Sequence, residues 1–328
     1  MKHRLVNQYQ ISLILLTALS LTSLAQEVPG PPSQSDKPLR ELHVIITDSK
    51  AHSLDDVKQN DIQVIEDGLP QTIESFSVEE RPVIYGLVID TSGSMRTQLP
   101  KIIDTAKKII ETNRPNDEAF IVSFVTSTRI LLLQETTSDK LQMLNALNKL
   151  FIEGGQTAVI DAVYLSAQKL LKTEPSDQKL KPRKALILIT DGEDRSSAYK
   201  EEQLLSMLQN SELKIFAIGL VEELDSTEAF IRRSPRERAV RLIERFTKET
   251  GGRAFFPRNK EDFTKVADEI THDLQRQYVV GYRSTAGAQK FHTVEIKVSD
   301  TPDKKKRRGF VQPKYKAQEL EPVVNKKP

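Results

Sequence analysis

Two carboxylates and three hydroxyls in this sequence have the types and spacing that a metal site needs. The segment Asp90-Thr91-Ser92-Gly93-Ser94 follows an apolar run over residues 83–89. Far downstream, Thr157 and the pair Asp191-Gly192 supply a further hydroxyl and a further carboxylate. These oxygen groups suit a hard divalent cation, Mg²⁺ in particular, because such ions take oxygen ligands in near-octahedral geometry. None of these residues resembles a nucleophile with a base beside it, which favours a binding module over an enzyme.

The chain around these residues alternates between predicted β-strands and α-helices. Apolar strands are predicted at residues 83–90, 118–124, 129–133, 185–190, 214–220 and 254–256. Amphipathic helices are predicted near residues 98–113, 140–151, 159–171, 200–209, 235–250 and 260–277. Alternation of this kind, with nearly continuous apolar strands, predicts a mostly parallel sheet covered by helices on both faces. The predicted fold class is therefore α/β, with a doubly wound sheet.

A doubly wound sheet would bring the candidate residues to one edge, because ligands bind there at the carboxyl ends of the strands. Asp90 closes the first predicted strand, Asp191 follows the fourth, and Thr157 lies in a glycine-containing loop before a helix. A tight glycine turn can direct Ser92 and Ser94 to the same place. If the neutral hydroxyls bind the ion directly, the ion keeps positive charge and an open position. An acidic ligand from a partner would suit that position.

These residues resemble the metal-ion-dependent adhesion site of the von Willebrand factor A-type domain, and the resemblance covers about residues 82–275. It implies that Ser92, Ser94 and Thr157 bind the metal directly. It also implies that Asp90 and Asp191 bind the metal directly or through water. The implied cofactor is Mg²⁺ or Mn²⁺, and the implied partner is a protein that supplies an Asp or a Glu to the metal.

Two β-rich segments flank the α/β region, with strands predicted at 42–47, 62–66, 72–78, 277–282, 291–298 and 309–315. Their motifs, which include Ile62-Gln63-Val64-Ile65-Glu66-Asp67-Gly68 and Gln277-Tyr278-Val279-Val280-Gly281-Tyr282, are similar to those of bacterial secreted proteins related to this domain and abundant in acidobacteria. Because neither segment is large enough to fold alone, we expect them to form one small all-β sandwich with the α/β domain inserted in it. The predicted organisation is a signal peptide (1–25), a flexible linker (26–39), the first half of the sandwich (40–80), the A-type domain (81–276), the second half of the sandwich (277–316) and a disordered tail (317–328).

The first 25 residues have the pattern of a secretory signal. Lys2 and Arg4 precede an apolar run, and small residues favour cleavage near Ala25 and Gln26. The run is short for a membrane span, so an uncleaved anchor is the alternative, and no later segment is long and apolar enough to cross a bilayer. An export signal together with no cysteine fits a bacterial periplasmic or secreted protein.

The composition argues against other classes of partner. The 48 Lys and Arg residues nearly balance the 46 Asp and Glu residues, so nucleic acid is not expected as a partner. Five scattered histidines and no cysteine give little material for a zinc site.

Other interpretations of the same residues stay open from the sequence. Ser92 and Ser94 could cap a helix after an ordinary strand-to-helix turn. The chain could be a metal-assisted hydrolase, although no histidine is near a motif residue in the sequence. It could also be a structural envelope protein whose metal mainly supports folding. Asp161, one turn after Thr157, is predicted to be a solvated helix residue.

Overall fold

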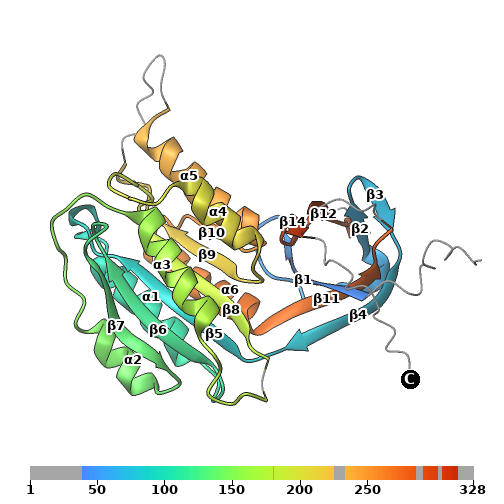
Figure 1. Ribbon diagram of the computed structural model, residues 1–328, viewed down its shortest axis with the longest axis horizontal. Coiled ribbons are helices and arrows are strands. Elements are labelled where there is room, and N and C mark those ends of the chain that lie inside the picture. The colour runs from blue at the N-terminus through green and yellow to red at the C-terminus, as the bar shows by residue number, and fades with distance from the viewer. Residues whose placement is uncertain (1–38, 180, 225–232, 286–290, 302–304, 317–328) are drawn as a thin grey trace, which may run out of the picture.

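A computed structural model describes residues 39–179, 181–224, 233–285, 291–301 and 305–316 of the chain. Figure 1 shows an α/β domain beside a smaller all-β unit. The predicted signal peptide and disordered tail, and the linker up to residue 38, lie outside the described residues. Within the described part of the chain, no helix has both the length and the apolar character needed to cross a membrane.

The α/β domain contains one six-stranded sheet. Its strands are β5 (Val83–Asp90), β6 (Glu118–Phe124), β7 (Ile130–Thr137), β8 (Arg183–Thr190), β9 (Lys214–Gly219) and β10 (Ala254–Phe255). The order across the sheet is β10-β9-β8-β5-β6-β7, and only the edge strand β7 runs antiparallel to its neighbour. Every residue of β5 and of β6 is buried, as expected for central strands covered on both faces. The predicted mostly parallel sheet is confirmed.

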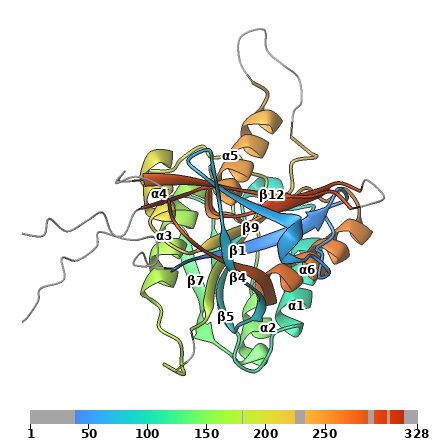
Figure 2. The ribbon, with the colours of Figure 1, turned by 90° about the vertical axis from the view of Figure 1, so that its right-hand side faces the viewer.

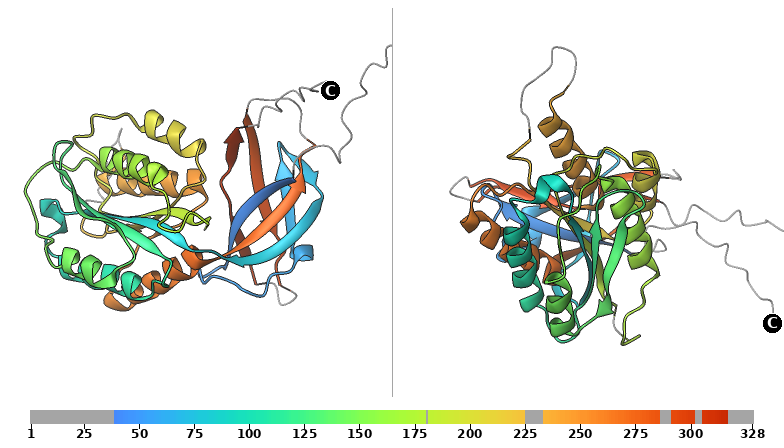
Figure 3. Two further views of the ribbon diagram at one scale, coloured as in Figure 1. Left: turned by 60° about the horizontal axis from the view of Figure 1, so that its bottom comes forward. Right: turned by 90° about the vertical axis from the view of Figure 1, so that its left-hand side faces the viewer.

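Three helices cover each face of this sheet (Figure 3). One face packs against α1 (Leu99–Glu111), α2 (Lys140–Leu147) and α6 (Lys260–Gln275). The other face packs against α3 (Val159–Lys172), α4 (Glu201–Gln209) and α5 (Pro235–Thr250). Alternate side chains of β5 enter the two cores, with Leu87 on the first face and Val88 on the second. Successive side chains of a strand point to opposite faces, so an apolar strand gives the sheet two apolar faces, and helices cover both.

The all-β unit is a sandwich of two four-stranded antiparallel sheets. One sheet has the order β13-β1-β11-β4 and the other has the order β14-β12-β2-β3. The bounds are β1 (Leu39–Asp48), β2 (Ile62–Glu66), β3 (Leu69–Gln71), β4 (Ile73–Glu80), β11 (Arg276–Arg283), β12 (Phe291–Val298), β13 (Arg307–Phe310) and β14 (Lys314–Lys316). Figure 2 shows the sandwich in front of the α/β domain.

Each sheet of the sandwich combines strands from before and after the α/β domain. The central pairs are β1 with β11 in one sheet and β2 with β12 in the other. Side chains from both sheets share one core, which includes Val44, Val64, Val280 and Ile296. The expected insertion of the α/β domain into a split sandwich is confirmed.

One predicted strand is divided in the structure, and one short strand was not predicted. Residues 309–315 contribute to two short strands, β13 and β14, which belong to different sheets. Pro313 lies between them, where a residue without an N–H group cannot extend a ladder, and its carbonyl accepts a hydrogen bond from Val294 N at 2.8 Å. The strand predicted at 72–78 is β4, which spans Ile73–Glu80. The strand that was missed is β3, which ends at Gln71 and belongs to the other sheet.

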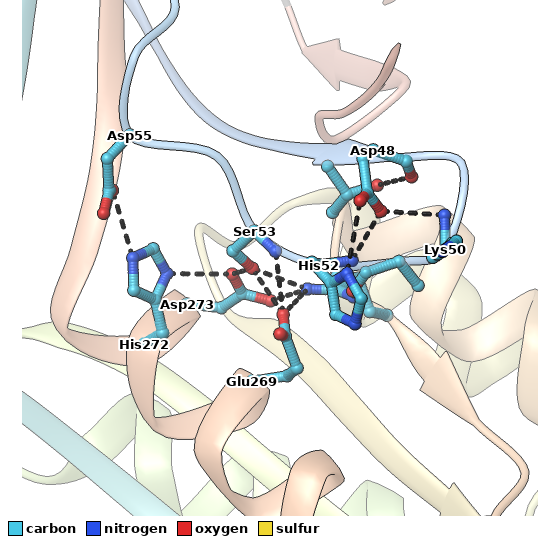
Figure 4. Close-up of polar contacts among 11 residues, drawn as sticks. Asp48, Lys50, His52, Ser53, Asp55, Glu269, His272 and Asp273 are labelled. Carbon is cyan, nitrogen blue, oxygen red and sulfur yellow. Dashed lines mark hydrogen bonds and ion pairs between the residues drawn. The ribbon is translucent and has the colours of Figure 1, made fainter. Parts of the chain in front are cut away.

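The loop that follows β1 ties the sandwich to helix α6 (Figure 4). Ser53 donates from its backbone N and its hydroxyl to Glu269 Oε2, at 2.9 and 2.8 Å. Arg253 Nη1 donates to Asp273 Oδ2 at 2.5 Å, and both of these side chains are buried. His272 Nε2 is 3.1 Å from Asp55 Oδ1. We call these residues the α6 junction.

Candidate metal centre

The two candidate carboxylates lie at the carboxyl ends of neighbouring strands. Asp90 is the last residue of β5, and Asp191 directly follows Thr190, the last residue of β8. Strands β5 and β8 pair in parallel with Ile89 opposite Ile189, so their ends coincide. Both carboxylates are almost completely buried, with Asp90 0% and Asp191 3% exposed.

Short hydrogen bonds connect four of the five candidate residues. Ser94 Oγ donates to Asp191 Oδ2 at 2.5 Å, and the Ser92 and Ser94 hydroxyls are 3.1 Å apart. Asp90 Oδ1 accepts a hydrogen bond from Ser92 N at 2.9 Å, and Asp90 Oδ2 accepts one from Thr190 Oγ1 at 2.7 Å. These contacts place two carboxylates and two serine hydroxyls in one cluster.

Thr157 reaches the same edge through its backbone. Its carbonyl accepts hydrogen bonds from Arg195 N at 2.8 Å and Ser196 N at 3.1 Å, in the loop that follows Asp191. Its own loop is attached to the Asp90 turn, because Glu153 N donates to Thr91 O at 2.8 Å. The structure therefore brings all five predicted residues to one edge of the sheet, four through mutual hydrogen bonds and Thr157 through the adjoining loops.

Gly192 allows the loop after Asp191 to pack tightly beneath α5. Its φ angle is +80°, a conformation that L side chains rarely adopt. A Cβ atom at this position would lie 2.8 Å from Ile243 Cδ1 and 3.0 Å from the Ala239 carbonyl oxygen, both on α5. The glycine after the second carboxylate thus fixes the path of the backbone that presents Asp191.

The electrostatics of the cluster favour a cation. Burial, and then the charge of Asp191, raise the pKa of Asp90 to about 7. Burial is also the main cause that raises the pKa of Asp191. Among the described residues, neither carboxylate forms an ion pair with Lys, Arg or His. Arg195 attracts Asp191 only from beyond ion-pair distance. Two buried carboxylates without a cation in contact are costly in free energy, and a cation between them would reduce that cost.

The available ligand set fits a hard cation and no softer one. Within the described part of the chain, no cluster of three or more His, Cys, Asp or Glu side chains is suited to a metal. An ion at this edge would therefore be held by hydroxyls as well as carboxylates, a set composed only of oxygen atoms. Such a set suits Mg²⁺ or Mn²⁺ better than Zn²⁺.

The structure argues against simple helix capping by the serines. Ser92 precedes the short 3-10 helix Gly93–Met95 but makes no capping hydrogen bond with its side chain. Its hydroxyl instead faces that of Ser94. The interpretation of this segment as an ordinary capped turn is therefore not supported.

Two residues near the site were not identified correctly from the sequence. The predicted solvation of Asp161 was wrong: this residue is 2% exposed and accepts hydrogen bonds from Ala198 N and Tyr199 N, at 2.9 and 2.8 Å. The apolar residues on all sides of Asp161 at the start of α3 were a signal that this turn is buried. Thr190 was not proposed as a site residue, although its hydroxyl holds Asp90 Oδ2.

A cleft of about 290 Å³ adjoins the site between the loop after Asp191 and helix α5. Its lining includes Gly192, Glu193, Arg195, Arg238 and Arg241. The three arginines are exposed to solvent. Arg195 forms an ion pair with Glu193 at 2.5 Å, whereas Arg238 and Arg241 form none with any described residue. The lining also contains the acidic residues Glu193, Asp194 and Glu201, so the cleft combines three arginines with three acidic side chains beside the candidate metal centre.

Comparison with solved structures shows similar chains from bacteria. An aerotolerance-related membrane protein from Bacteroides fragilis, carrying multiple mutations to serine, is 20% identical, with 57% of this chain and 98% of that chain covered and a TM-score of 0.43. BatB from Bacteroides thetaiotaomicron is 17% identical, with coverage of 58% and 98% and a TM-score of 0.44. A von Willebrand factor type A protein from Catenulispora acidiphila is 12% identical, with coverage of 87% and 74% and a TM-score of 0.46.

The sequence itself matches a family profile over most of the α/β domain. Residues 86–272 match the von Willebrand factor type A (VWA) domain, and this match includes all five candidate residues. Because it also spans more than half of the sequence, the chain belongs to the von Willebrand factor type A domain family.

Proposed function

We propose that this chain is an exported protein-binding module that engages an acidic residue of a partner protein through Mg²⁺ or Mn²⁺. The domain type is that of an interaction or adhesion module. The metal would be held by Asp90, Ser92, Ser94, Thr157 and Asp191. The observation that carries the proposal is the pair of buried carboxylates, joined to two serine hydroxyls and without a positive partner among the described residues.

The chain's own residues have distinct parts in this proposal. Asp90 and Asp191 provide the negative charge that attracts a cation, and their hydrogen bonds hold them in place before it arrives. Ser94 is exposed whereas Asp90 is fully buried, so a partner would approach from the side of Ser94. A bound divalent cation would supply an electrophilic position that a carboxylate of the partner can occupy.

The cleft beside the site supports an acidic partner. Arg238 and Arg241 lie on α5, close to the loop that carries Asp191, and would attract negative charge near the bound carboxylate. Of the acidic residues in the lining, Glu193 pairs with Arg195 and Glu201 pairs with Arg245. Asp194 Oδ1 accepts a hydrogen bond from Ile160 N at 3.1 Å and keeps its charge. Arg238 and Arg241, which form no ion pair with a described residue, would therefore be the groups that attract an acidic partner.

The proposal includes export and excludes catalysis. Export to the periplasm or the medium rests on the predicted signal in the first 25 residues, with an uncleaved anchor as the alternative. We propose a non-catalytic site because, among the described residues, the hydrogen bonds of Asp90 and Asp191 go to backbone N–H groups, Ser94 and Thr190. None goes to a histidine or lysine that could act as a general base. Turnover of phosphoester or peptide substrates with Mg²⁺ or Mn²⁺ would contradict this part.

The first experiment measures metal binding directly. Mn²⁺ is titrated into the metal-free full chain and followed by electron paramagnetic resonance. We expect Asp90→Asn to weaken Mn²⁺ binding by about tenfold or more, equivalent to about 1.4 kcal/mol, because it removes one of two site charges. Asp104→Asn is the matched control, since Asp104 is exposed on α1. Equal affinities of the two variants for Mn²⁺ would contradict the proposed metal site.

The second experiment tests partner binding. Envelope proteins of the source organism are passed over the immobilised chain with Mg²⁺ and then eluted with EDTA. We expect one or more proteins to elute with EDTA from the wild type and from Asp104→Asn, and none from Ser94→Ala. Capture that persists in excess EDTA would contradict a role for the metal in binding, even if Mn²⁺ binds.

A further inference from the structure

A small cavity lies at the junction of the two units, at the edge of the sheet opposite the candidate metal centre. It has a volume of about 60 Å³, and its lining includes His43, Arg81, Arg183, Lys214 and Gln277. Arg183 and Lys214 are the first residues of β8 and β9. At about 3.3 Å per residue, the length of β8 separates Arg183 from Thr190 by about 23 Å. The cavity is therefore independent of the metal centre.

Among the described residues, two cations in the cavity wall have only carbonyl groups as hydrogen-bond partners. Lys214 is 8% exposed, and its Nζ donates to the carbonyls of His43 and Gly251 at 3.0 and 3.2 Å. Arg183 donates to the carbonyls of Gln275 and Glu79 at 3.1 and 2.9 Å. Among the described residues, neither cation lies within ion-pair distance of a carboxylate.

The acidic side chains near these cations are committed elsewhere or exposed. Glu79 pairs with Arg81 at 2.5 Å, and Asp273 pairs with Arg253 at 2.5 Å. Glu212 also lines the cavity, but it is exposed to solvent, where its charge is screened. The interior of the cavity thus has an excess of positive charge.

This excess charge is unfavourable in the structure as it stands. Burial, and then the charge of Arg183, lower the pKa of Lys214 to about 8. Burial and the charge of Lys214, followed by those of Arg183 and Arg81, lower the pKa of His43 to about 4. Groups that repel one another in a buried place are stabilised by an anion between them.

The cavity also contains buried polar atoms without a partner among the described residues. These atoms are His43 Nδ1, Arg183 Nε and Gln277 Oε1. Gln277 is 3% exposed, and its Nε2 donates to Asp273 O at 2.8 Å, so its Oε1 is left as an acceptor. Buried polar groups are rarely left unsatisfied, and such atoms indicate a missing ligand or water. Two potential donors and one acceptor therefore line the same space.

We propose that this junction cavity binds a small oxyanion that carries a proton, of the hydrogen phosphate type. Arg183 Nε, His43 Nδ1 and Lys214 Nζ would donate to its oxygens, and its own hydroxyl would donate to Gln277 Oε1. A space of 60 Å³ holds about four waters at ~15 Å³ each, which is comparable to one tetrahedral oxyanion. The bound anion would join β1 and β11 of the sandwich to β8 and β9 of the VWA domain.

Calorimetric titration of the full chain with inorganic phosphate tests the proposal. The protein is first treated with EDTA, so that phosphate cannot act through a divalent metal, and ionic strength is held constant with NaCl. We expect saturable binding in the wild type. Lys214→Gln should weaken it by about tenfold or more, because one buried charge–charge contact is lost. Lys265→Gln, which removes an exposed charge on α6, should stay within about twofold.

Two further measurements distinguish the site from a general salt effect. Sulfate should bind about tenfold more weakly than phosphate, because at neutral pH it has no proton to donate to Gln277 Oε1. In the wild type, side-chain NMR signals of His43 should shift saturably with phosphate, while those of the exposed His52 should not. The NMR measurement decides the question even if Lys214→Gln fails to fold. An unshifted His43, or equal phosphate binding by Lys214→Gln and Lys265→Gln, would overturn the proposal.

Discussion

At the scale of single residues, the proposed function gives Asp90 opposite effects on folding and on metal binding. Its carboxylate is fully buried next to that of Asp191, and both causes that raise its pKa act against the ionised form. Two hydrogen bonds nevertheless fix the position of the carboxylate, since Ser92 N and Thr190 Oγ1 donate to its two oxygens. A metal-binding side chain of this kind is expected to reduce the stability of the metal-free protein.

Asp90→Asn should therefore stabilise the metal-free protein at alkaline pH. The folded-state pKa is about 7, whereas the ordinary pKa of an aspartate is 3.8, so wild-type stability falls as pH rises between these values and is lowest above pH 7. In EDTA at pH 8, we expect the free energy of unfolding of the variant to exceed that of wild type by up to about 4 kcal/mol, and at pH 4 we expect little difference. Denaturant unfolding at both pH values measures this difference. A variant that is less stable than wild type at pH 8 would contradict the electrostatic account.

The proximity of the candidate residues could be predicted from residue types and their positions at the strand ends. Asp90, Ser92, Ser94, Thr157 and Asp191 were identified because parallel strands bring their carboxyl ends together. The apolar residues around Asp161 indicate a buried turn, but the hydrogen-bond partners of its carboxylate could not be predicted in the same way. They are the backbone N–H groups of Ala198 and Tyr199, 37 and 38 residues away. Contacts of this range are set by tertiary packing and leave no local pattern.

At the scale of elements, helix α6 belongs to both parts of the molecule. Its apolar side packs against the sheet of the VWA domain, and its other side carries the α6 junction with the loop after β1. Arg253 and Asp273 form the buried part of this junction. His272 forms the part that responds to pH.

His272→Gln should destabilise the protein at acid pH and have little effect at alkaline pH. Asp273 and then Asp55 raise the pKa of His272 by stabilising the protonated ring. That stabilisation is fully present below about pH 6.5 and is lost as pH rises through the folded-state value. His272 is partly exposed, and Arg276 Nε also contacts Asp55 Oδ1 at 3.0 Å. We therefore expect the variant to lose no more than about 1 kcal/mol of unfolding free energy at acid pH.

Urea unfolding at pH 5.5 and pH 8.5 measures this effect. His52→Gln is the control, since His52 contacts only an exposed carboxylate, Asp48. A loss of stability in His272→Gln that is the same at both pH values would show that His272 acts by packing alone.

The extent of a strand could be predicted where it has its own apolar pattern, either continuous, as in β5 and β6, or alternating, as in β2 and β12. These four strands have the predicted bounds. Between β13 and β14, Pro313 marks a break, but no local pattern shows that the two parts enter different sheets. That outcome is decided by which strands are already paired, with β13 added to β1 and β14 to β12.

At the scale of the whole molecule, the sandwich is assembled from two distant parts of the sequence. Residues 39–80 supply β1 to β4, and their central partners β11 and β12 follow the VWA domain. We expect a fragment of residues 39–80 to be unfolded, because β1 and β4 would both lose β11 and β2 would lose β12. Circular dichroism and NMR dispersion of this fragment, compared with residues 39–316, test the expectation. A cooperative unfolding transition in the short fragment would refute it.

The direct continuation of β4 into β5 has a mechanical consequence. Only Arg81 and Pro82 separate the two strands, and β5 ends at Asp90. Tension applied at the candidate metal centre would therefore run along one nearly continuous extended segment into the sandwich. There β4 is paired with β11 from Glu80–Arg276 to Ile73–Tyr282, so the force would load this pairing in shear. In shear many backbone hydrogen bonds share the load at once, so this attachment would resist the tension that the proposed partner would exert.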